Sequence, residues 1–265
     1  MAGTTTVEVP TSDGAADAYL ARPDGDGPFP AVLFFMDAFG LRPRLAEMAE
    51  RIAAQGYLVL VPNLFHRTGP MPRVDLADLA DPQRRGELFG RIVPLITALT
   101  PELVARDAGA YLDFLAGRDD VAAGPVAIVG YCMGGTNALR AIEAHPDRIA
   151  ALASFHAGRV VTDEPDSPHR GVGAVTGELY FAHADRDDSM TADHIATLEG
   201  ALDAAGVTYR SEVYAGAPHG FTMADTAMYD EGATERHWAA LFDLLERTLR
   251  RAGRGGADDG PHASA

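Results

Sequence analysis

The sequence predicts an α/β protein with one mostly parallel, twisted sheet that carries helices on both faces. Short apolar runs of strand length alternate along the chain with longer amphipathic runs, which is the pattern of strands joined by helical crossovers. Some of the short runs have no polar position; Ala31–Met36 is the plainest, as expected for a strand covered on both faces. The length of 265 residues suits a single domain, which we expect over residues 1–252, followed by a disordered tail of Gly, Asp and small residues over 253–265.

The strands are expected where apolar or alternating runs meet turn residues. The first two form an antiparallel pair around the turn Ser12-Asp13-Gly14. The predicted strands are Thr5–Val9, Ala16–Ala21, Ala31–Met36, Tyr57–Val61, Pro125–Val129, Ile149–Phe155, Glu178–Ala182 and Tyr209–Tyr214.

The helices are expected where apolar residues recur at three- and four-residue spacing. The predicted helices are Leu45–Gln55, Gln83–Leu99, Pro101–Leu115, Gly134–Glu143, His194–Ala205 and Ala233–Arg251. Thr100 is placed to cap the third of them and Gly206 to end the fifth. The Pro-, Arg- and Asp-rich stretch Asn63–Leu79 and the stretch Val160–Thr176 are predicted to be loops.

The composition excludes several classes of partner and location. Acidic residues outnumber basic ones by 38 to 22, and the formal charge of −16 disfavours nucleic acids and anionic membrane surfaces. A small anionic substrate stays open, because one local Arg can outweigh the global sign. The single cysteine, the absence of a signal-peptide pattern and the absence of a membrane-length apolar run predict a cytoplasmic protein without an intramolecular disulfide. We expect a monomer or a homodimer, and the sequence does not distinguish the two.

The strongest chemical motif is Gly130-Tyr131-Cys132-Met133-Gly134-Gly135, which lies directly between a predicted strand and a predicted helix. A nucleophile on a strained strand-to-helix turn needs small neighbours, and this Gly-x-Cys-x-Gly pattern provides them. The start of the following helix favours a thiolate, and the amide of Met133 is placed to stabilise an oxyanion. The alternative is a buried, inert cysteine, which is the commonest fate of this residue.

A thiol nucleophile needs a base and an acid that orients the base, and in such sheets these follow in loops after later strands. Asp185 follows the strand that ends at Ala182, and Asp187 and Asp188 are its rivals. His219 follows the last predicted strand.

Two other histidines, His156 and His183, have alternative interpretations. His156 ends a strand, where it is a core residue or supports the site. His183 is a conceivable metal ligand, but no second pair of ligands is placed to complete a site.

Taken together, the cysteine motif, Asp185 with Asp188 behind it, and Ala217-Pro218-His219-Gly220-Phe221 resemble the dienelactone hydrolase family over about residues 7–250. The resemblance implies an α/β-hydrolase fold and a Cys-His-Asp triad that opens an enol-lactone or related ester without a metal or organic cofactor. It assigns Cys132 as nucleophile, His219 as base and Asp185 as its orienter. It also implies that the amides of Met133 and Ala38 form the oxyanion hole.

The chain departs from the family pattern at two positions. Asp37 stands where the family usually has a glutamate that holds the resting thiol; the alternative for Asp37 is a helix cap. Met223 stands where the diene-lactone enzymes have an arginine that binds the substrate carboxylate, and a thioether cannot do this.

Phe39, Arg44 and Met223 are therefore the candidate substrate-binding residues, with Arg42 or the pair Arg84 and Arg85 as other possible sources of positive charge. Two alternatives remain open: a general carboxylesterase or thioesterase with a non-lactone substrate, and a non-catalytic small-molecule-binding or thiol-sensing protein. Thiol sensing is disfavoured because a second cysteine is absent.

Overall fold

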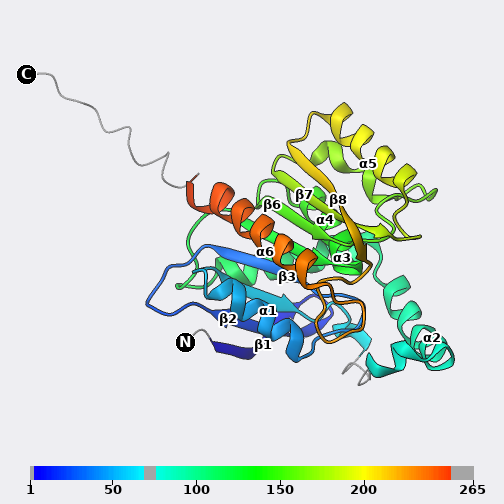
Figure 1. The fold of residues 1–265 in the computed structure, drawn as a ribbon. Coiled ribbons are helices and arrows are strands. Elements are labelled where there is room, and N and C mark those ends of the chain that lie inside the picture. The colour runs from blue at the N-terminus through cyan, green and yellow to red at the C-terminus, as the bar shows by residue number, and fades with distance from the viewer. Residues whose placement is uncertain (1–2, 69–75, 252–265) are drawn as a thin grey trace, which may run out of the picture.

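The computed structural model of the protein describes residues 3–68 and 76–251 and contains one eight-stranded sheet (Figure 1). Its strand order is β1-β2-β4-β3-β5-β6-β7-β8. The strands are β1 (Gly3–Thr11), β2 (Gly14–Arg22), β3 (Ala31–Phe35), β4 (Leu58–Pro62), β5 (Val126–Tyr131), β6 (Ile149–Phe155), β7 (Glu178–Arg186) and β8 (Tyr209–Pro218). All eight predicted strands are confirmed.

The sheet is antiparallel only at its first edge. β1 pairs with β2 and β2 with β4 in antiparallel register, while the pairs from β4 through β3 to β8 are parallel. The central strands β3, β4 and β5 are buried at every position, because helices cover both faces of the sheet. The predicted α/β fold with a mostly parallel sheet is therefore confirmed.

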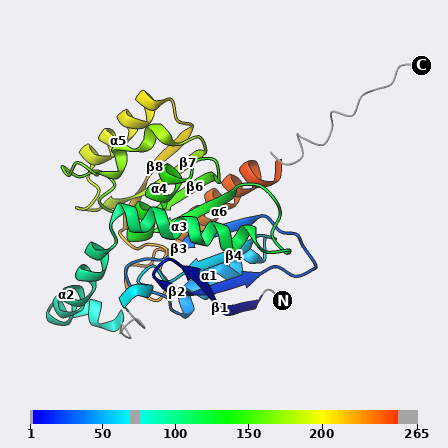
Figure 2. The same ribbon diagram turned by 180° about the vertical axis from the view of Figure 1, so that it is seen from behind.

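The described residues form six α-helices, five of which cover the sheet. They are α1 (Pro43–Ala53), α2 (Pro82–Ala98), α3 (Pro101–Ala116), α4 (Met133–Ala144), α5 (Ala192–Ala205) and α6 (Glu231–Leu245), which continues as a π-helical turn, η5 (Glu246–Arg251). α1 and α6 lie side by side on one face, as Figure 1 shows, and α3, α4 and α5 lie on the other face (Figure 2). α2 extends away from the sheet in both views.

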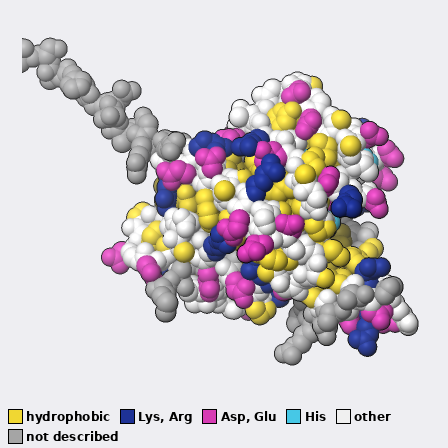
Figure 3. All heavy atoms as spheres, viewed as in Figure 1, with side chains coloured by type: hydrophobic (Ala, Val, Ile, Leu, Met, Phe, Trp, Pro, Cys, Tyr) yellow, Lys and Arg dark blue, Asp and Glu magenta, His cyan; other side chains and the backbone are white. Residues whose placement is uncertain are grey.

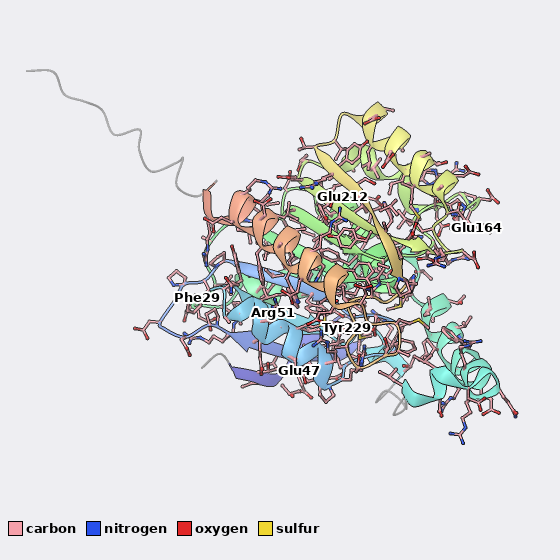
Figure 4. The ribbon with its side chains drawn as sticks, viewed as in Figure 1. Phe29, Glu47, Arg51, Glu164, Glu212 and Tyr229 are labelled. Atoms are coloured by element: carbon pink, nitrogen blue, oxygen red, sulfur yellow. The ribbon has the colours of Figure 1, made fainter. Side chains whose placement is uncertain are left out.

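The predicted helix ends agree closely with those observed. Thr100 accepts a hydrogen bond from the amide of Leu103 at the start of α3, and Gly206 ends α5 in the left-handed conformation. On the other face, Arg51 of α1 bridges to α6, where its guanidinium lies 4.6 Å from the centre of the Trp238 ring and bonds Glu235 (Figure 4).

The main differences from the prediction concern the last two strands and the loops. β7 continues to Arg186 and β8 to Pro218, each four residues beyond the predicted end. The expected loops contain short 3₁₀ turns, namely His66–Thr68 and Leu76–Ala80 in the first and Pro168–Arg170 and Val172–Ala174 in the second. Residues 69–75 and the predicted tail, 253–265, lie outside the described residues.

Candidate active site

Cys132 lies at the tight turn between β5 and α4, where the sequence motif predicts it. Its φ of 54° and ψ of −122° are a strained combination for a residue with a side chain, and such strain costs about 1–3 kcal/mol and clusters at functional sites. The cysteine is partly exposed, and all of β5 before it is buried. The turn therefore presents the sulfur at the carboxyl edge of the sheet.

The glycines of the motif are required by close backbone contacts. A Cβ at Gly130 would lie 2.2 Å from the carbonyl oxygen of Gly134, and one at Gly134 would lie 2.4 Å from the oxygens of both Phe35 and Met36. A Cβ at Gly135 would collide with Ser154 of β6. The end of β3 thus passes directly against the first turn of α4, which brings the segment after Met36 to the nucleophile.

His219 joins the sulfur to a carboxylate. Its Nε2 lies 3.0 Å from Sγ of Cys132, and its Nδ1 lies 2.6 Å from a carboxylate oxygen of Asp187. The three side chains come from the ends of β5, β7 and β8, and the imidazole contacts both of its partners at once. The structure brings together the predicted Cys132 and His219.

The carboxylate that contacts His219 belongs to Asp187, and not to Asp185, where the sequence analysis expected it. The reason is that β7 continues to Arg186: Asp185 still lies within the strand, at a bulge in its pairing with β8. The Asp185 carboxylate accepts the amide of Gly216 at 2.7 Å and so ties β7 to the end of β8. Asp187 is the first residue beyond the strand, where its side chain can turn toward the loop.

The charges of the three groups support one another. Burial disfavours the imidazolium form of His219, but the facing sulfur of Cys132 and the hydrogen bond to Asp187 outweigh it and raise the pKa of His219 well above its ordinary value. Burial also opposes ionisation of Asp187, but His219 and the donors of Ser189 lower the pKa of this carboxyl. The shifts therefore favour an imidazolium on His219 paired with a carboxylate on Asp187, with the sulfur of Cys132 on the other side of the ring.

His156 packs against His219 from the interior of the protein. Its ring is fully buried, packs edge-to-face against His219 with the centres 5.4 Å apart, and has Nε2 2.8 Å from the hydroxyl of Thr222. Burial and the nearby charge of His219 lower the pKa of His156 well below its ordinary value, so the ring is neutral. The sequence left two interpretations of His156 open, a core residue or a residue that supports the site. Its contacts with His219 and Thr222 agree with the second.

Asp37 does not make the expected contact with the thiol. Within residues 3–68 and 76–251, its carboxylate binds the guanidinium of Arg42 at 2.7 and 2.8 Å and accepts the amide of Phe39, while Cys132 contacts His219. Asp37 is not a helix cap either, because Arg42 holds the capping position of α1. The carboxylate is thus withdrawn from the sulfur by an arginine five residues away.

The three candidate substrate-binding residues have different surroundings. Met223 is 2% exposed, and its sulfur faces the guanidinium of Arg42 at 3.4 Å. Arg44 binds the carbonyl of Thr222 and the carboxylate of Glu47. Phe39 is partly buried and packs against Phe89 of α2, with ring centres 6.4 Å apart. The guanidinium of Arg42 also lies over the Phe39 ring, 5.8 Å from its centre.

The two predicted oxyanion donors lie in suitable backbone positions. Met133 is the first residue of α4, so its amide has no acceptor within the helix. Ala38 is in the turn just after β3, which the Gly134 contacts bring against the nucleophile. Both amides belong to rigid backbone at the carboxyl edge of the sheet.

In residues 3–68 and 76–251, no three His, Cys, Asp or Glu side chains gather as a metal site, and His183 contacts the hydroxyl of Ser211 instead. Over the same ranges no single helix is long and apolar enough to span a membrane; only the pair Gln83–Ala98 and Pro101–Ala116, bent by 77°, meets the criterion jointly.

Comparison with known proteins matches residues 16–249 to the dienelactone hydrolase family. The chain is 27% identical over 235 residues to a carboxymethylenebutenolidase of Rhodococcus opacus, covering 87% of this chain and 86% of that one. It is 28% identical over 240 residues to a Yersinia pestis protein provisionally named carboxymethylenebutenolidase, covering 89% and 85%.

The fold has close counterparts among solved structures. A dienelactone hydrolase-like promiscuous phosphotriesterase from metagenomic libraries superposes with a TM-score of 0.71 at 23% identity, covering 93% of this chain and 99% of that one. A dienelactone hydrolase of Anabaena variabilis superposes with a TM-score of 0.63 at 21% identity, covering 94% and 99%. With the fold, the elbow and the matched range in agreement, this chain belongs to the dienelactone hydrolase family of α/β-hydrolases and is a carboxylic ester hydrolase.

Proposed function

We propose that the protein hydrolyses a lactone or carboxylic ester through a thioester acyl-enzyme on Cys132, with His219 as the acid–base and Asp187 as the residue that orients it. The observation that carries this proposal is the continuous contact from sulfur to imidazole to carboxylate, at 3.0 and 2.6 Å. A nucleophile, a base within hydrogen-bond reach and a third group that orients the base are the parts that nucleophilic catalysis needs.

Acylation begins with the attack of the Cys132 thiolate on the carbonyl carbon. The carbonyl oxygen becomes an oxyanion, which the amides of Met133 and Ala38 stabilise. When this intermediate collapses, the C–O bond breaks, a thioester forms, and the imidazolium of His219 gives its proton to the leaving oxygen. An enol leaving group departs readily, because the enolate that forms is delocalised.

Deacylation then requires His219 to act as a base. The negative sulfur is one of the groups that raise the pKa of His219, and acylation removes this charge. The imidazole is then free to take a proton from water, whose oxygen attacks the thioester carbonyl. Collapse of the second intermediate releases the carboxylic acid and regenerates the thiolate. The same contact thus serves both half-reactions.

The proposal is tested by trapping the acyl-enzyme. Rapid quenching of the protein with an activated aryl ester should give an adduct of the mass of the acyl group on the peptide that contains Cys132, and hydroxylamine should release it. Cys132→Ala should show no adduct and should lose turnover by about 10³-fold or more. An adduct on another residue, or full turnover by Cys132→Ala, would contradict the mechanism.

The lactone and open-chain ester readings share this chemistry and differ in the leaving group. In a lactone the leaving oxygen stays attached to the acyl chain, so only an open-chain ester releases a separate alcohol during acylation. Comparing kcat/KM for an enol-lactone, a saturated lactone and a short aryl ester separates the readings. A non-catalytic role predicts stoichiometric binding of all three with no turnover.

A further inference from the structure

Arg42 is the cation nearest in sequence to the predicted oxyanion loop, and its hydrogen-bonding capacity is already filled. A guanidinium has five N–H donors. Nε donates to Asp225, Nη1 to Asp37 and to the carbonyl of Gly40, and Nη2 to Asp37 and, at 3.4 Å, to Asp225 and the sulfur of Met223. The Arg42 side chain is only 12% exposed. It therefore has no donor free for a substrate carboxylate.

The cluster of Arg42, Asp37 and Asp225 carries a net negative charge. One guanidinium is paired with two carboxylates, whose side chains are 3% and 27% exposed. Asp37 immediately precedes the predicted oxyanion donor Ala38, and Asp225 lies six residues after His219. The cluster thus joins the two loops that flank the nucleophile and repels an anion that approaches along them.

The same edge of the molecule presents apolar side chains. Phe89 and Val93 are exposed on one side of α2, and Met228 and Tyr229 are exposed in the loop after His219. Phe89 contacts Phe39, next to Ala38, and Cβ of Met228 lies 3.6 Å from the position a side chain would take at Gly220, the neighbour of His219. Large exposed apolar side chains gathered near a site indicate an apolar ligand.

From these contacts we propose that the site is selective for an uncharged, apolar substrate: it takes neutral lactones or esters and discriminates against lactones or esters that also carry a carboxylate. This inference rests on the proposed ester hydrolysis and specifies its substrate class. Arg42 acts as a positioning residue that holds Asp37 and the Ala38 turn, and Asp225 supplies the excess negative charge. Phe39, Phe89 and Met228 contact the acyl group.

The experiment compares two lactones with the same ring: a carboxymethylene-butenolide as its carboxylate and as its methyl ester, which removes the charge and adds one methyl group. Ring opening of each is followed by the loss of its absorbance. The expected result is a kcat/KM at least about fivefold higher for the methyl ester, the factor that one like charge within a few ångströms of a partly exposed site produces.

Two variants test whether the cluster of Arg42, Asp37 and Asp225 causes the difference in kcat/KM between the two substrates. Asp225→Asn removes the excess charge and should shift the ratio of acid to ester kcat/KM toward the acid by about fivefold. Asp119→Asn is the matched control, because Asp119 is an exposed carboxylate before β5, at the opposite end of this strand from Cys132. The control should leave the ratio unchanged.

The outcomes distinguish this inference from the proposed function. A wild-type preference for the free acid overturns the inference alone. If Arg159→Met then abolishes that preference, the exposed Arg159 in the loop after β6 is the anion receptor. A ratio that Asp225→Asn and Asp119→Asn shift equally also overturns the assignment to the cluster. No turnover of either substrate, or of a neutral aryl ester, overturns the proposed function itself.

Discussion

A difference of two residues decides which carboxylate orients His219. Asp185 and Asp187 are alike in the sequence, yet one binds a backbone amide and the other the imidazole. The amide of Gly216 that Asp185 accepts belongs to β8, which carries His219 at its end. Each carboxylate therefore supports the histidine, Asp187 directly and Asp185 through the position of the strand.

Asp187→Asn should lower kcat for a neutral ester by about 10²–10⁴-fold, because an amide cannot stabilise the imidazolium and favours the wrong tautomer. Asp185→Asn is the matched comparison: it removes the same charge two residues away and should cost less than about tenfold. Steady-state kinetics of the two purified variants measure this. A larger loss in Asp185→Asn than in Asp187→Asn would return the orienting role to Asp185.

The raised pKa of His219 has a direct consequence for the pH dependence of acylation. A raised pKa means that the proton is held as the pH rises through the ordinary value of about 6.5 and is lost only above it. The leaving group needs that proton, so kcat/KM for a neutral alkyl ester should show no alkaline fall between about pH 7 and about pH 9.

Asp187→Asn removes a group that raises the pKa of His219, so its alkaline limb should move down into this window. The pH profiles of kcat/KM for the wild type and the variant, measured with the same ester, give both limbs. A wild-type limb near the ordinary histidine value would contradict the thiolate–imidazolium pair.

At the scale of elements, the site depends on how closely β3, β5 and α4 approach one another. Gly134 faces the carbonyl oxygens at the end of β3, and backbone cannot move aside as a flexible side chain can. This contact places the Ala38 turn beside Cys132. The packing of three elements thus positions the second oxyanion donor, which is the reason the motif needs glycine at this position.

Gly134→Ala should therefore destabilise the protein by about 3 kcal/mol or more, since its Cβ would lie 2.4 Å from two backbone oxygens. Gly200→Ala is the matched control, because Gly200 lies inside α5 with open space at its Cβ position. It should raise stability by up to about 1 kcal/mol. Urea unfolding followed by circular dichroism measures both; equal midpoints for the two variants would contradict the packing argument.

At the scale of the whole molecule, the net negative charge affects how charged ligands approach the site. The formal charge of −16 is spread over the surface, and acidic and basic side chains are interspersed on the face in Figure 3. Such a field acts at long range on any charged ligand and has no effect on a neutral one. The net charge of the molecule and the cluster of Arg42, Asp37 and Asp225 both repel an anionic ligand.

Added salt should therefore raise kcat/KM for a carboxylate-bearing ester and leave that for its neutral analogue nearly unchanged. Between about 10 mM and about 500 mM NaCl the screening length falls from about 30 Å to a few ångströms, which removes the long-range repulsion. Initial rates at subsaturating substrate measure the effect. A fall in kcat/KM with salt for the anionic ester would indicate a cationic receptor at the site.

Local sequence patterns determined most of the fold and two of the three side chains that meet at the proposed active site, Cys132 and His219. The apolar runs of β3 to β6, the caps Thr100 and Gly206, and the glycines around Cys132 are short-range signals whose physical cause acts within a few residues. His219 could be selected from the nine histidines because it follows a strand, and the carboxyl ends of parallel strands lie at one edge of a sheet, where Cys132 also lies. These predictions needed no knowledge of which side chains meet across the structure.

Tertiary structure alone decided where the charged side chains turn. Asp187 rather than Asp185 reaches His219 because pairing with β8 extends β7 to Arg186, and Asp37 turns from Cys132 because Arg42 folds back onto it from the start of α1. A loop carboxylate has many partners of similar energy, and the choice depends on strand length, a bulge and a neighbouring loop. None of these is recorded in the residues near the carboxylate itself.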